Sequence, residues 1–250
     1  MKKKTNILIF PLLIIGVFLV FASSCEKDDN NGSSSNNPTN GKTTAVFNSA
    51  VTYGTMTDQD GNVYKTVTIG TQTWMAENLR TTKYNDGTAV SNATTEWASL
   101  TTGAYCNYNN TTDIDTIATY GRLYNWYAVN TSKLAPRGWH VPSDAEWSTL
   151  TYYLGGESVA GDKLKETGAT HWIRPHTGVT NETGFTALPG GYRLFSNGAY
   201  LYIGEVGNWW SSTESSTSNA WMRYVEKTSG DVVSLRFVKE FGFSVRCVKD

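Results

Sequence analysis

The sequence predicts an α+β fold of short helices and small antiparallel sheets, connected by many loops. A strongly capped helix is expected over residues 143–154, in the middle of the chain. Beyond residue 184, short β-type segments alternate with glycine-rich turns, and strands that follow separate helices are typical of the α+β class. Aromatic residues make up 13% of the chain and charged residues only 17%, less than the usual quarter. We therefore expect an aromatic core under a loop-rich surface.

The first predicted strands form a hairpin over residues 57–79. Alternating side chains indicate the strands, with turns at residues 58–62 and 70–71. Asp58 and Asp60 resemble part of a calcium-binding loop, but the other ligands of such a loop are missing. We therefore predict no metal ion at this turn.

Helices are expected over residues 95–100, 121–128, 143–154 and 161–166. The helix over 143–154 has the clearest start, because Ser143 stands three residues before Glu146 and the two can form a capping box. The pair Gly155-Gly156 ends it.

The C-terminal part is predicted to be rich in strands. They are expected over residues 185–188, 209–213, 220–226, 232–237 and 243–248. A Thr-Ser-Gly-Asp turn joins the third and fourth of these, which therefore form a hairpin.

The N-terminus is typical of an exported protein. Lys2, Lys3 and Lys4 precede an apolar run over residues 7–22, which is shorter than the roughly 20 residues of a membrane span. Small residues then precede Cys25 and resemble a bacterial lipobox, with Ala22 where leucine is more usual. Residues 1–24 are therefore predicted to be a lipoprotein signal peptide and Cys25 the lipid-anchored residue.

Residues 25–56 are predicted to be a disordered tether, because no apolar side chain occurs between Glu26 and Thr44. Its acidic start, Glu26-Lys27-Asp28-Asp29, resembles the surface-export signal of Bacteroidetes lipoproteins, although a solvated linker has the same composition. Two or three acyl chains on Cys25, at about 0.8 kcal/mol per buried CH₂, would anchor the chain stably in membrane lipid. We expect an outer-membrane, lipid-anchored protein exposed on the cell surface.

The charge of the chain argues against a nucleic-acid partner. Formal net charge is −1, and it becomes −4 without residues 1–24, because 18 basic residues then face 22 acidic ones. A nucleic-acid interface needs a basic face.

Five ordered blocks carry a family resemblance. They are Gly61–Leu79 with its Trp-Met-Ala-Glu-Asn-Leu end, Tyr120–Trp126, Gly138–Trp147, Trp210–Thr213 and Gly242–Val248. Together they resemble the Fibrobacter succinogenes major paralogous domain, found in surface lipoproteins of Bacteroidetes and Fibrobacteres. The resemblance covers residues 57–250 and implies no general activity.

A weaker resemblance concerns the fold. The Pro-Ser-x-x-Glu-Trp helix start at Pro142, the tryptophan-rich strand and the terminal Gly-Phe…Arg-Cys-Val are similar to formylglycine-generating-enzyme domains. This resemblance implies a C-type-lectin-like fold. Those enzymes bind copper through two nearby cysteines, whereas Cys106 and Cys247 stand far apart here. The resemblance therefore does not extend to the oxygenase chemistry.

No other residue pattern indicates an enzyme. Gly-x-Ser-x-Gly does not occur, and the sequence by itself singles out no carboxylate pair. His140 is expected to be a hydrogen-bonded structural residue. His171 and His176 lack cysteine or acidic partners at zinc-ligand spacing. We predict no catalytic site, metal or cofactor.

Binding is the remaining function, and aromatic residues with interleaved polar ones are its candidates. They are Tyr192, Arg193, Tyr200, Tyr202, Glu205 and Asn208. Aromatic faces beside hydrogen-bonding groups suit sugar rings. Trp209 and Trp210 are expected in the core. The chain is thus predicted to be a surface binding or adhesion protein whose partner is a glycan or a surface protein; a structural component of a surface or fimbrial assembly is the alternative, and a hydrolase is less favoured.

Cys106 and Cys247 are also candidates for a disulfide. Export to an oxidising compartment favours pairing, although two separate buried thiols are the alternative. A bridge would close a loop of roughly 140 residues and would tie the last strand to the helical half.

Overall fold

The computed structural model describes Met1 and residues 37–175 and 177–250. The signal peptide and Cys25 lie outside the described residues, as does His176. Within the described part, no helix is both long and apolar enough to cross a bilayer. Residues 37–250 fold as mixed helices and small sheets, which confirms the α+β prediction.

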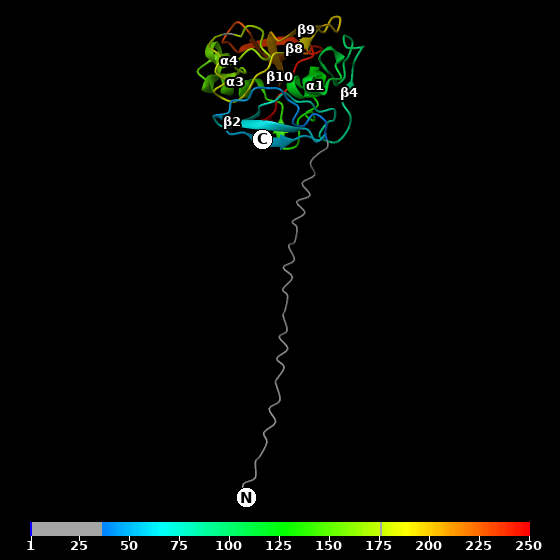
Figure 1. Ribbon diagram of the computed structural model, residues 1–250. Helices are drawn as coiled ribbons and strands as arrows, with labels where there is room; N and C mark the ends of the chain where they lie inside the picture. Colours follow the sequence, from blue (N-terminus) through cyan, green and yellow to red (C-terminus); the bar gives the residue numbers. More distant parts are fainter. Residues whose placement is uncertain (2–36, 176) are drawn as a thin grey trace. The chain divides into compact units, whose positions relative to one another are not determined.

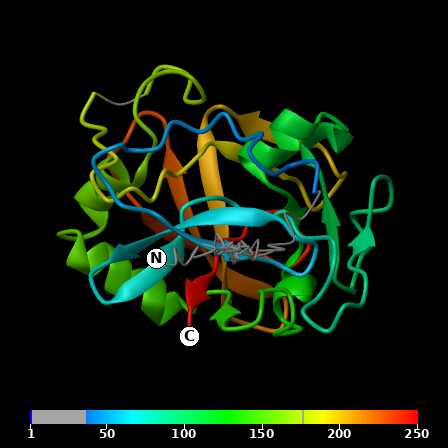
Figure 2. The ribbon, with the colours of Figure 1, turned by 60° about the horizontal axis from the view of Figure 1, so that its bottom comes forward.

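A five-stranded antiparallel sheet joins both ends of the fold (Figures 1 and 2). Its strands, in spatial order, are β1 (Gly54–Thr57), β2 (Val63–Ile69), β3 (Gln72–Met75), β13 (Val248–Lys249) and β7 (Trp139–His140). The first three are the predicted hairpin and its preceding strand. The C-terminal strand β13 lies between β3 and β7, so the chain's end is part of the sheet.

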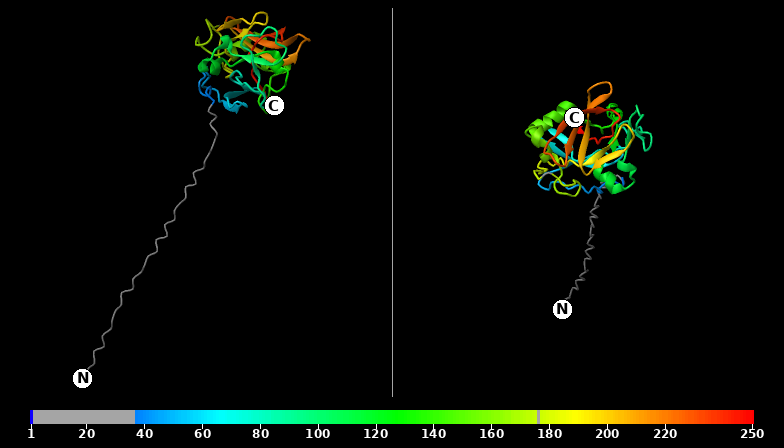
Figure 3. Two further views of the ribbon diagram at one scale, coloured as in Figure 1. Left: turned by 90° about the vertical axis from the view of Figure 1, so that its right-hand side faces the viewer. Right: turned by 90° about the horizontal axis from the view of Figure 1, so that it is seen from above.

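A second group of strands lies at the top of Figure 1 and spreads across the view from above in Figure 3. It contains the sheet of β10 (Val206–Glu214), β11 (Asn219–Glu226) and β12 (Val233–Val238), and the hairpin of β8 (Gly190–Arg193) and β9 (Tyr200–Ile203). The predicted strand 209–213 is confirmed as part of β10, which begins three residues earlier, and the hairpin 220–237 is confirmed within one residue.

The remaining elements are short. A small sheet contains β4 (Ser91–Asn92), β5 (Ala104–Cys106) and β6 (Leu123–Tyr124), and the helical segments are η1 (Tyr108–Asn110), α1 (Ile114–Tyr120), α2 (Trp126–Val129), α3 (Asp144–Tyr153) and α4 (Glu157–Leu164). The capping box at the start of α3 is formed: Ser143 Oγ accepts from Glu146 N at 3.2 Å, and Glu146 Oε2 accepts from Ser143 N at 2.7 Å.

Aromatic side chains and one buried arginine fill the core between the two strand groups. Trp74 and Trp147 pack with ring centroids 4.7 Å apart. Asn78 Oδ1 accepts from both Trp209 Nε1 and Arg246 Nε at 2.9 Å. The indole and guanidinium donors are therefore satisfied without water, as burial requires.

Three predicted helices differ from the structure. Residues 95–100 form turns, with Trp97 Nε1 donating to the Glu240 carbonyl at 2.6 Å. Residues 121–128 are divided between β6 and α2, because Gly121 ends α1 at φ 72° and packs directly against Asn78. The helix expected over 161–166 begins and ends earlier, as α4.

Two predicted strands also differ. Residues 185–188 make only an isolated bridge at Ala187, and the carbonyls of Phe185 and Thr186 accept from Arg246 instead of from a neighbouring strand. The last strand is limited to Val248–Lys249, because the preceding residues reach their neighbours through isolated bridges. At residues 185–186, hydrogen bonds from the buried Arg246 side chain thus replace the strand-to-strand hydrogen bonds that alternation in the sequence predicts.

The predicted tether is wrong for residues 37–56. Buried Thr39 bonds Asn62 and Arg80, and Val46 N donates to Glu166 Oε1 at 2.6 Å. Phe47 packs on the hydrophobic core. This N-terminal strap, residues 37–53, is held by hydrogen bonds, so its polar composition does not make it disordered.

The predicted disulfide is also wrong, since Cys106 and Cys247 are both free thiols. Cys247 belongs to the largest core cluster and Cys106 to a separate one around Trp97. Burial raises the pKa of both thiols, so each behaves as a small apolar side chain.

Candidate functional site

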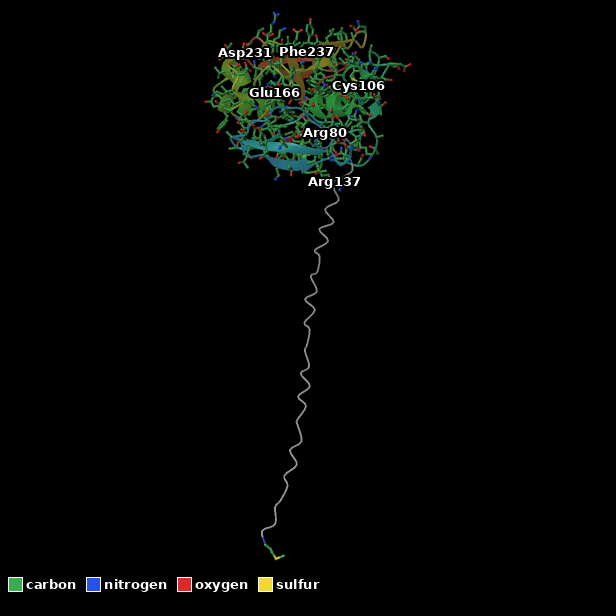
Figure 4. The ribbon with its side chains drawn as sticks, viewed as in Figure 1. Arg80, Cys106, Arg137, Glu166, Asp231 and Phe237 are labelled. Atoms are coloured by element: carbon green, nitrogen blue, oxygen red, sulfur yellow. The ribbon has the colours of Figure 1, made fainter. Side chains whose placement is uncertain are left out.

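An aromatic surface lies where the β8–β9 hairpin meets β11 and β12. We call it the aromatic platform and define it by Tyr192, Phe195, Tyr202, Tyr224, Leu235 and Phe237. Tyr202 is 52% exposed, Phe195 38% and Leu235 36%, whereas the other three are half-buried. Figure 4 labels Phe237 at the top of the folded unit. Large apolar side chains this exposed and this close together are typical of a binding surface.

Ring contacts make the platform continuous. The Tyr192 ring lies 5.7 Å from Tyr202, measured between centroids, and 5.8 Å from Phe241. Phe241 in turn contacts Phe195 at 5.1 Å and Phe237 at 4.9 Å. Phe241 is buried and therefore acts as the floor under the exposed rings.

Strand register places the remaining members on the same face. Leu235 pairs with Met222 across β11 and β12, and Tyr224 pairs with Val233. Because side chains alternate along a strand, Tyr224 and Met222 share a face with Leu235 and Phe237. The Tyr224 hydroxyl donates to Glu226 Oε2 at 2.8 Å, and burial together with this carboxylate raises the pKa of Tyr224. Its hydroxyl is therefore neutral at physiological pH.

Arg193 is a support of the platform and not a ligand-binding residue. It is only 3% exposed, and its guanidinium lies between the rings of Trp97 at 4.7 Å and Tyr200 at 4.9 Å. Its nitrogen atoms donate to three loop carbonyls, those of Gly198, Ala93 and Thr94. The arginine thus fixes the loop that follows β8.

The other predicted site residues divide into exposed and structural ones. Tyr202 is exposed as expected, whereas the half-buried Tyr200 donates its hydroxyl to Asn110 Oδ1 at 2.7 Å. Asn208 is buried. Glu205 pairs with Lys227 Nζ at 2.7 Å beside the hairpin. The structure therefore brings Tyr192 and Tyr202 together and turns Arg193 and Asn208 inward.

Four platform residues were missed in the sequence: Phe195, Tyr224, Leu235 and Phe237. Alternation in the predicted strand 232–237 is a signal for two of them, because it puts Leu235 and Phe237 on one face of that strand. What the alternation could not reveal is which protein segment faces them, because the β8–β9 hairpin packs there through tertiary contacts.

A second cluster has the order of groups found in hydrolases. Thr44 Oγ1 lies 2.9 Å from His171 Nε2, and His171 Nδ1 lies 2.7 Å from Glu166 Oε2. Thr44 is exposed, His171 is buried and Glu166 is fully buried. Figure 4 labels Glu166. This is the nucleophile, base and orienting acid arrangement of a catalytic triad.

The backbone around Thr44 argues for a structural role of this cluster. The N–H groups of Thr44, Ala45 and Val46 already donate to Thr119 Oγ1, Thr43 Oγ1 and Glu166 Oε1. Acyl transfer needs free N–H donors for the developing oxyanion, and these three are occupied. The cluster therefore fastens the N-terminal strap to the domain.

The third titratable cluster holds the C-terminus. His140 Nδ1 lies 2.6 Å from Asp250 Oδ1, and His140 Nε2 lies 2.7 Å from Glu146 Oε1. Partial burial alone would lower the pKa of His140, but the hydrogen bonds to Asp250 and Glu146 outweigh it and raise that pKa. This confirms the expected hydrogen-bonded role of His140.

No group of three or more His, Cys, Asp or Glu side chains suited to a metal ion occurs in the part of the chain that the structure describes. Asp58, considered above for calcium, accepts hydrogen bonds from the Tyr64 hydroxyl at 2.6 Å and from Asn62 Nδ2 at 2.8 Å. These bonds explain the aspartate as part of the turn.

Comparison with known proteins gives one match. The family model described as the Fibrobacter succinogenes major domain matches residues 67–249. No curated protein matches the chain, and no solved structure matches it.

Proposed function

Because the chain belongs to the Fibrobacter succinogenes major domain family, we propose that it is a lipid-anchored outer-membrane protein that binds glycan at the cell surface. The aromatic platform is the binding site in this proposal. In this proposal the protein is non-catalytic, needs no cofactor, and is held in membrane lipid through acylated Cys25. The fold is of the C-type-lectin-like kind, with short helices and small sheets that carry a ligand surface on loops and hairpins.

The exposure of the platform is the observation that carries this proposal. Tyr202, Phe195 and Leu235 are all exposed, and a contiguous exposed apolar patch marks a ligand-binding or protein-binding surface. Sugar rings have apolar C–H faces that stack on aromatic rings and polar rims that bond neighbouring hydroxyl groups. The phenol groups of Tyr192, Tyr202 and Tyr224 provide both kinds of contact.

The first residues of the folded unit leave the platform uncovered. Asn37 Nδ2 donates to the Asp60 carbonyl, in the turn before β2. β2 lies at the bottom of Figure 1 and β9 at the top. Residue 37 therefore lies at the end of the folded unit opposite the β8–β9 hairpin.

A glycan array with the full chain, purified in detergent, tests the binding. We expect retention of glycans with exposed neutral rings. Tyr202→Asn should weaken that binding about tenfold or more, by analogy with the roughly 1–3 kcal/mol of aromatic stacking on bases. Asparagine is chosen because Tyr202 has φ 61°, which asparagine tolerates well.

Tyr152→Asn on α3 is the matched control, since Tyr152 is 85% exposed on another surface. It should leave binding unchanged. Equal affinities of wild type and Tyr202→Asn, with both folded, would contradict a role of the platform in binding.

Membrane attachment is tested separately by Cys25→Ser. We expect the variant to leave the membrane fraction or to keep residues 1–24, because the acceptor thiol for the lipid is gone. The measurement is fractionation combined with N-terminal mass. A variant that fractionates and migrates like the wild type would exclude the lipid anchor.

A structural role in a surface assembly is the second candidate, and β12 favours it. In the described residues, β12 pairs only with β11, so one edge of its six residues has no partner strand. Such an edge can accept a strand of another subunit. Exposed Arg236 in the middle of β12 discourages this pairing. Concentration-dependent self-association of the full chain, without glycan binding, would favour assembly.

A further inference from the structure

A surface hollow lies on the five-stranded sheet. Strand β2 of this sheet lies at the bottom of Figure 1, whereas β8 and β9, which carry part of the aromatic platform, lie at the top. The volume of the hollow is about 580 Å³. Five of its ten lining residues are threonines, and we call it the threonine hollow. Its chief lining residues are Thr52, Thr55, Thr68, Thr73, Trp139 and Lys249.

Sheet register places four of these side chains, those of Thr68, Thr73, Trp139 and Lys249, on one face. Thr68 pairs with Thr73, and their hydroxyl oxygens lie 3.0 Å apart. Lys249 pairs with Trp139 in the neighbouring strands. Val248 pairs with Trp74, so the residues next to them, Lys249 and Thr73, project together to the other face. Hydroxyl groups, an indole and an ammonium group thus meet over one sheet.

Lys249 is the only charged side chain among the lining residues. It is exposed and forms no ion pair with any residue that the structure describes. The side-chain carboxylate of the neighbouring Asp250 lies 2.6 Å from His140 Nδ1, measured from Oδ1, and is therefore engaged there. By contrast, Lys227 near the aromatic platform is paired with Glu205. An unpaired cation thus distinguishes the hollow from the platform.

We propose that the threonine hollow is a second binding site, which takes an acidic glycan with uronate sugars. Lys249 pairs with the sugar carboxylate, Trp139 stacks on a ring, and the threonine hydroxyls bond the ring hydroxyls. Hydroxyl-rich and carboxylate-bearing ligands match this set of groups, whereas an apolar peptide would leave the hydroxyls unpaired. This site does not depend on the glycan binding proposed for the platform.

Titration calorimetry with the full chain in detergent tests the site, with an oligogalacturonate as the acidic probe and a xylan oligomer of equal length as the neutral one. We expect the acidic probe to bind about tenfold more tightly or better. Lys249→Glu should weaken it about fivefold, within the range of exposed charge pairs. Joint replacement Thr68→Val and Thr73→Val, which keeps shape and strand preference, should weaken it about tenfold.

The matched controls are an exposed threonine and an exposed lysine that lie outside the hollow. Thr57→Val alters an exposed threonine of β1 outside the hollow, and Lys42→Glu reverses a charge on the N-terminal strap. Both should leave affinity unchanged. Equal affinity for the two probes, no binding of the acidic probe, or unchanged affinity in both hollow variants would overturn the proposal. Loss of acidic-glycan binding only in Tyr202→Asn would also overturn it and would move that ligand to the platform.

Discussion

The aromatic platform and the threonine hollow are two exposed surfaces that differ in how the protein supports them. Beneath the platform, the buried Arg193 holds three loop carbonyls and lies between two rings. Beside the hollow, the partly exposed His140 holds Glu146 and Asp250 from β7. A buried cation that satisfies several carbonyls contributes far more to stability than an exposed ion pair. The two surfaces should therefore respond very differently to loss of their supports.

Arg193→Met should give the largest effect. It removes the guanidinium from the carbonyls of Gly198, Ala93 and Thr94 and leaves these acceptors without a donor. We expect a loss of about 3–5 kcal/mol in the free energy of unfolding, because hydrogen bonds to charged groups contribute about 1.5–3 kcal/mol each and part of this is recovered by burying methionine. Urea denaturation of the full chain measures it.

The comparison variant for this measurement is Lys249→Glu at the hollow, which should change the unfolding free energy by no more than about 0.5 kcal/mol. If Arg193→Met cost less than about 1 kcal/mol, the arginine would not be the support of the platform.

A much smaller effect than that of Arg193→Met is expected from pH at His140. We call the contacts of His140 with Glu146 and Asp250 the clamp. Because the pKa of His140 is raised in the folded protein, the stability that the clamp contributes is fully present below the ordinary histidine pKa of 6.5 and is lost as pH rises through the folded-state pKa. Burial would raise the pKa of Glu146, but hydrogen bonds from Ser143 outweigh it and lower that pKa. The contribution of Glu146 to stability is therefore present above pH 4.5 and is lost as pH falls through the folded-state pKa. The clamp is therefore strongest between about pH 4.5 and 6.5.

His140→Gln tests this window. Because the His140 side chain is 41% exposed, solvent screening limits the difference from wild type to less than about 1 kcal/mol at pH 5.5, and it should vanish near pH 8.5. Denaturation at the two pH values measures it. If the difference in unfolding free energy between wild type and His140→Gln grew with pH instead of vanishing, the ion pair of His140 would be excluded as its cause.

Much of the local structure is determined by the sequence itself. The capping box of Ser143 and Glu146 needs only residues three apart, and the hairpin of β11 and β12 needs only alternation around a short turn. The burial of Trp209 and Trp210 follows from their size and apolar character. Such features depend on neighbours in the chain, so their signals are local.

Tertiary structure alone decided the rest, because it depends on which distant groups satisfy one another. Residues 185–188 do not form a strand, because two of their carbonyls accept hydrogen bonds from Arg246, about 60 residues later in the chain. The polar strap is ordered because Glu166 and Thr119 accept hydrogen bonds from its N–H groups. Arg193 and Tyr202 look alike as candidates in the sequence, yet one is 3% and the other 52% exposed. Hydrogen-bond partners far along the chain determine which polar and aromatic side chains turn inward, and only the folded arrangement supplies those partners.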